Sequence, residues 1–188
     1  MARRRRRDWH PKEADSDTTL SIPGVAFQDN LRQRDQRGEF RKPYSRANFS
    51  GKGPSEVFFT KSEKGVVRGM HLSHVRTLSS KLVTLVHGQI FDVLIDLRKG
   101  PHFGSINTII MTDESPTLVI PSGVAHGFQS LSSECIVLYC TQHTHAAAYE
   151  GGVNPLSLDI DWPHPVSAIS DRDKNLPSIQ MYERHYFG

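Results

Sequence analysis

Seven short runs rich in β-branched and other apolar residues, separated by turn residues, fill the middle of the chain and most restrict how it can fold. Such runs, with turn signals between them, are typical of an all-β sandwich or barrel. The same region contains no segment of ten or more residues with helical periodicity, and the chain has no repeats of solenoid length. The expected strands are Val57–Thr60, Val66–Leu72, Lys81–Val86, Ile90–Leu97, Ile106–Met111, Thr117–Ile120 and Cys135–Thr141.

The turn residues His87 and Gly88 join two of these runs and predict a β-hairpin between Leu82–Val86 and Ile90–Ile95. Exposed strand edges promote aggregation, so a set of strands like this must pair its edges or close on itself. About eight strands enclose a space that is filled by side chains or holds one small ligand. We therefore expect a jelly roll with a polar pocket at one end.

The two ends of the chain differ from this β-rich middle. Residues 1–20 are polar and charged and predict a flexible basic leader, whereas residues 21–50 predict an extended arm. Residues 142–188 predict a loop-rich segment with a short helix near Ser170–Lys174. Because 188 residues suffice for one domain with a substantial core, we expect residues 21–188 to form a single domain.

The net charge of +3 comes from the N-terminal tail. Arg3 to Arg7 against Asp8 give residues 1–10 a charge of +4, which leaves −1 for residues 11–188. Clustered arginines can attract phosphates, but no basic stripe follows them, so we expect a solubilising tail and no nucleic-acid partner. No stretch approaches the roughly 18–20 apolar residues of a membrane helix, and no apolar segment follows the arginines. We therefore expect no membrane partner and a cytoplasmic protein.

The two cysteines are Cys135 and Cys140. On one strand they would lie about 17 Å apart on opposite faces, whereas a disulfide needs Cα atoms within about 7 Å. We therefore expect two buried, reduced thiols rather than a disulfide.

Three polar residues, Lys81, Asp92 and Tyr139, interrupt otherwise apolar rows of the expected strands. Because side chains alternate along a strand, each of the three shares its face with two apolar neighbours. Buried Lys and Asp are rare unless they are paired, because removing a lone charge from water is costly. Each case alone could be an accident of an outward-facing row. Together they indicate a ligand pocket lined by a few convergent polar groups.

Several motifs, spread in order over residues 35–175, share one resemblance. The segment Gly65-Val66-Val67-Arg68-Gly69-Met70-His71 is similar to the G-V-L-R-G-L-H signature of the dTDP-4-dehydrorhamnose 3,5-epimerase family. Each motif alone is weak, but the ordered set is specific. The other matching segments are Lys81-Leu82-Val83, Phe91-Asp92-Val93 with Asp96-Leu97-Arg98, Pro121–Phe128 (P-x-G-x-A-H-G-F), Leu138-Tyr139, Ile160–Pro163 and Ile169–Asp173.

The resemblance implies a cupin-type jelly-roll β-barrel, also called a double-stranded β-helix, with an N-terminal arm and a short C-terminal helical or loop segment. It also implies an isomerase that inverts C3, C5 or both carbons of a nucleotide-linked 4-keto-6-deoxyhexose. The ketone acidifies the carbons beside it, so a base on one face of the ring and an acid on the other suffice. Neither a cofactor nor a metal is expected.

The same resemblance assigns four catalytic residues. His71 would be the base, which suits histidine because an unperturbed imidazole has a pKa of about 6.5. Asp173 would bond the far ring nitrogen and stabilise the imidazolium. Tyr139 would return a proton from the opposite face of the sugar. Lys81 would stabilise the enolate oxygen as a positive charge placed where negative charge develops.

Four further residues are implied to bind the nucleotide sugar. Arg68 resembles a pyrophosphate-binding position, where a planar guanidinium can hold two oxygens. His126 resembles a second pocket histidine, and Asp92 would orient and neutralise the catalytic lysine. Arg37 lies in a D-x-R-G-like segment that would help to bind the nucleotide. The family also implies a homodimer that exchanges N-terminal strands.

The chain departs from the family pattern around the pocket rather than among the proton-transfer residues. Thr144 and His145 replace two tyrosines that follow the catalytic tyrosine, and Val153-Asn154-Pro155 replaces W-N-D-P. The upstream asparagine region reads Val57-Phe58-Phe59-Thr60. The nucleotide, the sugar or the choice of carbon can therefore differ from those of the rhamnose pathway.

Each candidate residue, considered alone, could also have a purely structural role. His71 and His126 could be ordinary hydrogen-bonded histidines, and Tyr139 could be a core aromatic residue. Asp173 could cap a short helix, a position that Asp favours.

A metal-dependent cupin is the first competing function. Pro121-x-Gly123-x-x-His126 fits the second metal motif of that superfamily, but the first motif requires H-x-H, and only His71 and His74 are available. Positions i and i+3 of a regular strand face opposite ways, so these two side chains would not converge on one metal.

Two other functions would use a similar pocket. A sugar-nucleotide 3,4-ketoisomerase would not need an acid on the opposite face of the ring, and a non-catalytic sugar-binding barrel would need no proton transfer at all. Deuterium wash-in from heavy water and the effect of replacing Tyr139 distinguish these alternatives.

Overall fold

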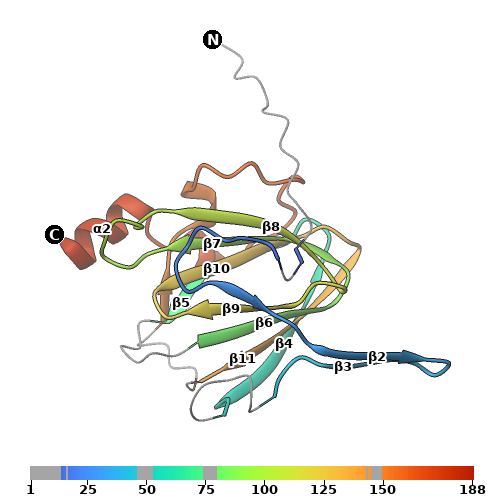
Figure 1. Ribbon diagram of the computed structural model, residues 1–188. Coiled ribbons are helices and arrows are strands. Elements are labelled where there is room, and N and C mark those ends of the chain that lie inside the picture. The colour runs from blue at the N-terminus through green and yellow to red at the C-terminus, as the bar shows by residue number, and fades with distance from the viewer. Residues whose placement is uncertain (1–13, 16, 46–52, 74–79, 143, 145–149) are drawn as a thin grey trace.

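Two antiparallel five-stranded sheets face each other and enclose the core of the protein (Figure 1). The computed structural model describes residues 14–15, 17–45, 53–73, 80–142, 144 and 150–188. The first sheet has the strand order β1-β9-β6-β11-β4, and the second has the order β12-β5-β10-β7-β8. This arrangement confirms the jelly-roll barrel.

Every run expected from the sequence is a strand. The first sheet contains β1 (Ala26–Gln28), β9 (Thr117–Pro121), β6 (Ser80–His87), β11 (Glu134–Thr141) and β4 (Glu56–Glu63). The second contains β12 (Glu150–Gly152), β5 (Val67–Ser73), β10 (Val124–Ser130), β7 (Gln89–Asp96) and β8 (Ile106–Thr112). A separate hairpin pairs β2 (Leu31–Asp35) with β3 (Gly38–Lys42). The strands β1, β2, β3, β10 and β12 were not expected.

The predicted hairpin between β6 and β7 is wrong, because these two strands belong to different sheets. β6 pairs with β9 and β11, whereas β7 pairs with β10 and β8. The chain crosses between the sheets at Gly88, which has a φ of 90°. A Cβ atom there would lie 2.4 Å from the carbonyl oxygen of Glu134. The glycine therefore allows the backbone to pass close to Glu134 as the chain crosses between the sheets, and it does not form a two-residue hairpin turn.

A hydrophobic cluster fills the space between the sheets. Both sheets contribute side chains that are at most 1% exposed, which excludes water from this layer. The cluster includes Leu85 of β6, Leu94 of β7, Leu118 of β9, Phe128 of β10 and Val137 of β11.

The C-terminal segment covers the outer face of the second sheet with a second cluster (Figure 1). As a result β7 is buried on both faces, which explains its nearly continuous apolar sequence. The segment contains a 3₁₀ turn (Pro155–Ser157), α1 (Asp171–Lys174) and α2 (Ile179–Phe187). α1 confirms the short helix expected near Ser170–Lys174. α2 was not expected, and it begins at the Ser178 cap, whose side chain accepts a hydrogen bond from the Met181 amide at 3.3 Å.

Part of the expected flexible leader over residues 1–20 packs against the barrel. Ala14 is buried in the core between the sheets, and its amide donates to the carbonyl oxygen of Ile110 at 2.9 Å. Leu20 packs against the same core. The residues around Ala14 and Leu20 therefore contact the barrel, whereas residues 1–13, with the arginine cluster, lie outside the described part of the chain.

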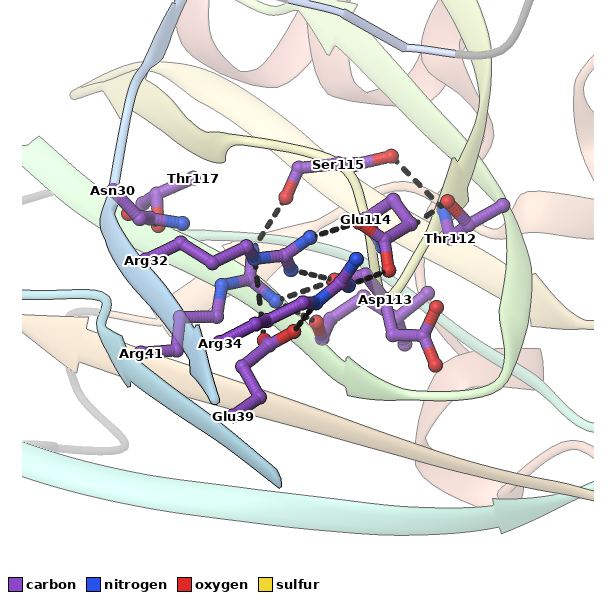
Figure 2. Close-up of polar contacts among 11 residues, drawn as sticks. Asn30, Arg32, Arg34, Glu39, Arg41, Thr112, Asp113, Glu114, Ser115 and Thr117 are labelled. Atoms are coloured by element: carbon purple, nitrogen blue, oxygen red, sulfur yellow. Dashed lines mark hydrogen bonds and ion pairs between the residues drawn. The ribbon is translucent and has the colours of Figure 1, made fainter. Parts of the chain in front are cut away.

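The β2–β3 hairpin extends from the barrel and is anchored by arginines, as Figure 2 shows. Arg32 and Arg34 both form ion pairs with Glu114 in the turn between β8 and β9, and with Glu39 on their own hairpin at 3.2 and 2.7 Å. Arg41 donates to the carbonyl oxygens of Leu85 and Asp113, each at 2.8 Å, and to that of Ser115. Within the extended arm predicted for residues 21–50, β1 joins the first sheet beside β9, and β2 and β3 form a strand pair that charged hydrogen bonds attach to the barrel.

Cys135 and Cys140 are both buried and free, as expected. Both lie on β11, and they belong to different hydrophobic clusters on its two faces. Among the described residues, no helix is long and apolar enough to cross a membrane.

Candidate active site

A cavity of about 620 Å³ opens between the two sheets and receives side chains from both. Its volume lies within the usual range for small-molecule sites. Six of the eight predicted site residues line it. These are His71, Arg68, His126 and Asp173 on the side of the second sheet, and Lys81 and Tyr139 on the first sheet.

His71 and Asp173 form a hydrogen-bonded pair at the cavity wall. The Nε2 atom of His71 lies 2.6 Å from Oδ1 of Asp173, and the other carboxylate oxygen accepts the Gly69 amide at 3.2 Å. Burial alone would raise the pKa of the Asp173 carboxyl, but these hydrogen bonds hold it below its usual value. The carboxylate therefore fixes the ring and leaves Nδ1 as the nitrogen available for proton transfer. The cap of α1 is Ser170, not Asp173.

A β-bulge brings Arg68 and His71 to the same side of β5. On a regular strand, residues three apart face opposite ways. Here His71 pairs with His126 and Arg68 pairs with Phe128, so three steps along β5 match two steps along β10. Both side chains consequently reach the cavity.

Glycines allow the close approach of β5 to β10 at this bulge. A Cβ atom on Gly69 would lie 2.5 Å from the Cα atom of Gly127, and Gly69 has a φ of 112°. A Cβ atom on Gly127 would lie 2.6 Å from the carbonyl oxygen of Arg68. Each motif that marked a site histidine, Arg68-Gly69-Met70-His71 and His126-Gly127-Phe128, therefore carries a glycine that this contact requires.

Tyr139 lies on β11, across the cavity from the sheet that carries His71. Burial raises the pKa of its phenol well above the usual value, and the nearby Thr60 hydroxyl offsets this only in part. The phenol is therefore neutral over the physiological pH range and can donate a proton. The ring of Phe58 stacks on it, and the His126 ring packs against it in an edge (T-shaped) arrangement, with the two ring centroids 6.2 Å apart.

Lys81 lies on β6 beside Tyr139, because its register partner on β11 is Thr141. Burial lowers the pKa of its amine to about 8, although attraction to Asp92 and Glu150 opposes this shift. The group is thus a cation near neutral pH whose charge is lost within the mildly alkaline range.

Asp92 does not line the cavity, so the expected direct contact with substrate is not seen within the chain. It is fully buried on β7 behind His126, and its Oδ2 atom lies 2.7 Å from Nε2 of that ring. Burial lowers the pKa of His126, so its imidazole is neutral. The other oxygen of Asp92 has no hydrogen-bond partner in the described part of the chain. Asp92 acts on Lys81 through its charge, whereas the alternation of β7 had indicated a side chain that lines the pocket.

Arg37 also stays outside the cavity of its own chain. It lies in the turn between β2 and β3, where its guanidinium pairs with Asp35 and its side chain is 85% exposed. The turn projects with its hairpin away from the two sheets (Figure 1).

Several other cavity residues, among them aromatic, hydroxyl and charged side chains, were not singled out from the sequence. Phe58 and Thr60 lie on the inward face of β4, and Glu56 lies at its start. The alternation that indicated Lys81 would also have indicated the first two. Glu150 and Arg172 form an ion pair of 2.6 Å at the cavity wall, and no local pattern joins residues that far apart in the chain.

The described residues contain no group of three or more His, Cys, Asp or Glu side chains arranged as a metal site. The two site histidines are instead each hydrogen-bonded to one carboxylate, Asp173 or Asp92. His74, which the metal-dependent alternative requires, lies outside the described residues.

The arrangement suits proton transfer to and from a planar carbon. A carboxylate-held imidazole and a neutral phenol come from opposite walls of one cavity, and an ammonium group lies on the same wall as the phenol. Such a set can remove a proton on one side, stabilise the negative charge that forms, and return a proton on the other side.

Comparisons of the sequence and of the structure with known proteins agree on one family. The family model described as dTDP-4-dehydrorhamnose 3,5-epimerase matches residues 19–181. A dTDP-4-dehydrorhamnose 3,5-epimerase of Streptomyces griseus is 32% identical over 174 residues, which cover 88% of this chain and 87% of that protein.

Solved structures of similar enzymes share the fold. A 4-keto-6-deoxy sugar epimerase from the novobiocin biosynthetic gene cluster of Streptomyces spheroides matches with a TM-score of 0.81 and 31% identity, over 95% of this chain and 94% of the other. ChmJ, a 3′-monoepimerase from Streptomyces bikiniensis solved in complex with dTDP-quinovose, matches with a TM-score of 0.79 and 30% identity, over 88% and 89% of the two chains.

The Asp173 pair predicts a pH-dependent loss of stability. Because the folded-state pKa lies below the ordinary value of 3.8, the stabilisation is present above about pH 4 and is lost as the pH falls through the folded pKa. Asp173→Asn should lower the free energy of unfolding by about 1–2 kcal/mol at pH 7 and by much less near pH 3. Urea unfolding at both pH values measures this.

Asp171→Asn is the matched control, since Asp171 lies in the same helix with a side chain that is 91% exposed. Its effect on stability should be small at both pH values. An equal loss at pH 7 and pH 3 for Asp173→Asn would contradict the ion-pair explanation.

Proposed function

Because the chain belongs to the dTDP-4-dehydrorhamnose 3,5-epimerase family and is a sugar-nucleotide epimerase, we propose that this cavity inverts C3, C5 or both carbons of a dTDP-linked 4-keto-6-deoxyhexose. The observation that carries the proposal is the placement of His71 and Tyr139 on opposite walls of one cavity. The names of the similar enzymes support the substrate class: one is a dTDP-4-dehydrorhamnose 3,5-epimerase, one is a 4-keto-6-deoxy sugar epimerase, and one is a 3′-monoepimerase solved in complex with dTDP-quinovose.

The first step is removal of the proton beside the ketone. Nδ1 of His71 takes the proton, and the electron pair of the broken C–H bond moves into the ring to form an enolate. Asp173, hydrogen-bonded to Nε2, stabilises the imidazolium that results. Lys81 supplies a positive charge to the enolate oxygen, at a site where burial strengthens the attraction.

The second step returns a proton on the opposite face. The Tyr139 hydroxyl donates its proton to the planar carbon. The phenolate then regains a proton from solvent, and the His71 imidazolium releases to solvent the proton that it took from the sugar. This direction of transfer requires a protonated phenol at the working pH, which burial of Tyr139 secures. Return of a proton from His71 instead would exchange the hydrogen without inversion.

Arg68 binds the nucleotide diphosphate, together with other groups of the cavity. Nε of Arg68 donates to Ser62 at 2.8 Å and one terminal nitrogen donates to the Lys61 carbonyl at 3.1 Å, which orients the guanidinium. His126, held by Asp92, supports the sugar side of the cavity. No resident cofactor or metal takes part in this scheme.

We further propose that the protein works as a homodimer through the outer face of the first sheet. Val57 and Phe59 on β4 and Val86 on β6 are 58%, 67% and 48% exposed on this face. Apolar patches of this kind mark interaction surfaces. Leu31 and Phe40 are also exposed on the projecting β2–β3 hairpin. In such a dimer the hairpin can deliver Arg37 to the cavity of the partner chain.

Replacing Tyr139 by Phe tests the proposed mechanism directly. The variant should lose inversion by about 10²-fold or more, since a positioned acid contributes about that factor. In heavy water, deuterium should still enter the carbon beside the ketone with retention, because His71 is unchanged. NMR of a panel of dTDP-, GDP- and CDP-linked 4-keto sugars follows both events. Unchanged turnover would instead support a ketoisomerase, and absence of wash-in by the native protein would support a sugar-binding barrel.

Activity should fall as the pH rises through about 8, the pKa of Lys81. Deprotonation removes the charge that stabilises the enolate, so kcat/KM should show an alkaline limb near this value. Lys81→Gln should be slow at every pH and lack this limb. Retention of the limb in Lys81→Gln would assign it to another group.

Phe59→Glu should weaken the proposed dimer, because it would bury a charge in an apolar interface. Sedimentation at micromolar concentration measures the dissociation constant. Met181→Glu is the matched control, since Met181 is 55% exposed on α2 beside the second sheet. Equal effects of the two substitutions, or none, would count against an interface on the first sheet.

A further inference from the structure

Phe58 is the nearest aromatic neighbour of the proposed acid and lies at the mouth of the same cavity. It is the direct cross-strand partner of Tyr139 in the β4–β11 register. The ring centroids are 5.0 Å apart and the ring planes differ by 17°, so the two rings stack. Phe58 is 44% exposed, whereas Tyr139 is 7% exposed. Phe58 therefore shields the phenol on the side of the cavity mouth.

The stack restricts where the Tyr139 hydroxyl can point. A tyrosine ring facing a cavity can tilt into the open space, and a neighbouring ring packed on its face removes that freedom. Thr60, two residues further along the same face of β4, lies beside the phenol, and its hydroxyl oxygen is buried. On the other side, the edge of the His126 ring limits movement toward the second sheet. The strand β4 thus holds the acid in place without supplying a reacting group.

We propose that Phe58 is a positioning residue that holds Tyr139 in the orientation for protonating the enolate, and so sets the balance between inversion and simple hydrogen exchange. This inference rests on the proposed epimerase function. His71 is held separately by Asp173 on the other wall, so a change at Phe58 leaves proton removal in place.

We expect a change at Phe58 to alter the partition of the enolate between hydrogen exchange and inversion, rather than to lower both rates equally. After His71 removes the proton, the enolate either regains hydrogen from the imidazolium, with retention, or receives it from Tyr139, with inversion. Misplacing a reacting group by about 1 Å can cost about 10²-fold. A displaced phenol therefore lowers inversion while wash-in of solvent hydrogen with retention continues.

The test compares Phe58→Ala with the native protein in heavy water, using a dTDP-linked 4-keto-6-deoxyhexose that the native protein turns over. NMR gives the rate of deuterium entry with retention and the rate of inversion in the same sample. For Phe58→Ala we expect inversion to fall about tenfold or more and wash-in to fall less than about threefold. Phe58→Leu retains apolar volume against the ring and should recover most of the inversion.

Tyr186→Ala is the matched control. Tyr186 is also a half-exposed aromatic ring that lies on a buried tyrosine, with its centroid 4.4 Å from that of Tyr182, but on α2 away from the cavity. The Tyr186→Ala variant should show the same partition between hydrogen exchange and inversion as the native protein. Thermal unfolding of each variant checks that it is folded.

Two results would overturn the inference. Exchange and inversion could fall in parallel in Phe58→Ala, which indicates a general structural role, or KM could rise with an unchanged partition, which indicates a contact with the nucleotide. Failure of the native protein to exchange hydrogen with any 4-keto sugar nucleotide would refute the proposed function itself. The two failures are therefore distinguishable.

Discussion

The contact between β5 and β10 at Gly69 and Gly127 determines the geometry of the site. The two backbones approach so closely that a Cβ atom on either glycine would overlap the other strand. The bulge at this contact turns both Arg68 and His71 toward the cavity. The Gly69 amide also donates to Asp173, so the same backbone segment fixes the carboxylate that holds the base. A single crowded point in the second sheet thus positions the proposed base, its carboxylate partner and the side chain proposed to bind the diphosphate.

The opposite wall contributes through burial rather than through a hydrogen-bonded pair. Removal from water keeps the Tyr139 phenol protonated and brings the pKa of Lys81 down to about 8. An acid and a cation therefore lie together on the first sheet, while the second sheet presents a base held by a carboxylate. The separation of the sheets keeps the base and the acid apart, which inversion requires because the two protons must travel on opposite faces of the sugar ring.

Sequence periodicity identified the strands whose side chains alternate between apolar and polar faces. It failed where contacts between backbones determine which strand forms and which sheet it joins. The inward-facing rows that contain Lys81 and Tyr139 could be recognised in the sequence, because apolar residues flank each of these two residues on the same face of its strand. β10 was missed because a histidine and a glycine interrupt its apolar residues, although the close packing with β5 demands that glycine. The turn at Gly88 read as a hairpin because a local pattern cannot reveal that the two flanking strands join different sheets.

The sequence by itself determined the β-rich architecture, the absence of a disulfide and the set of residues that resemble a proton-transfer site, since these depend on periodicity, spacing and residue chemistry. Only the tertiary structure decided which of those residues share one cavity. It placed six of them there, set Asp92 behind His126, and left Arg37 on the projecting hairpin. It also stacked Phe58 on Tyr139. The reason is physical: pairing between strands brings together residues that are far apart in the chain, and no local pattern records the register that joins them.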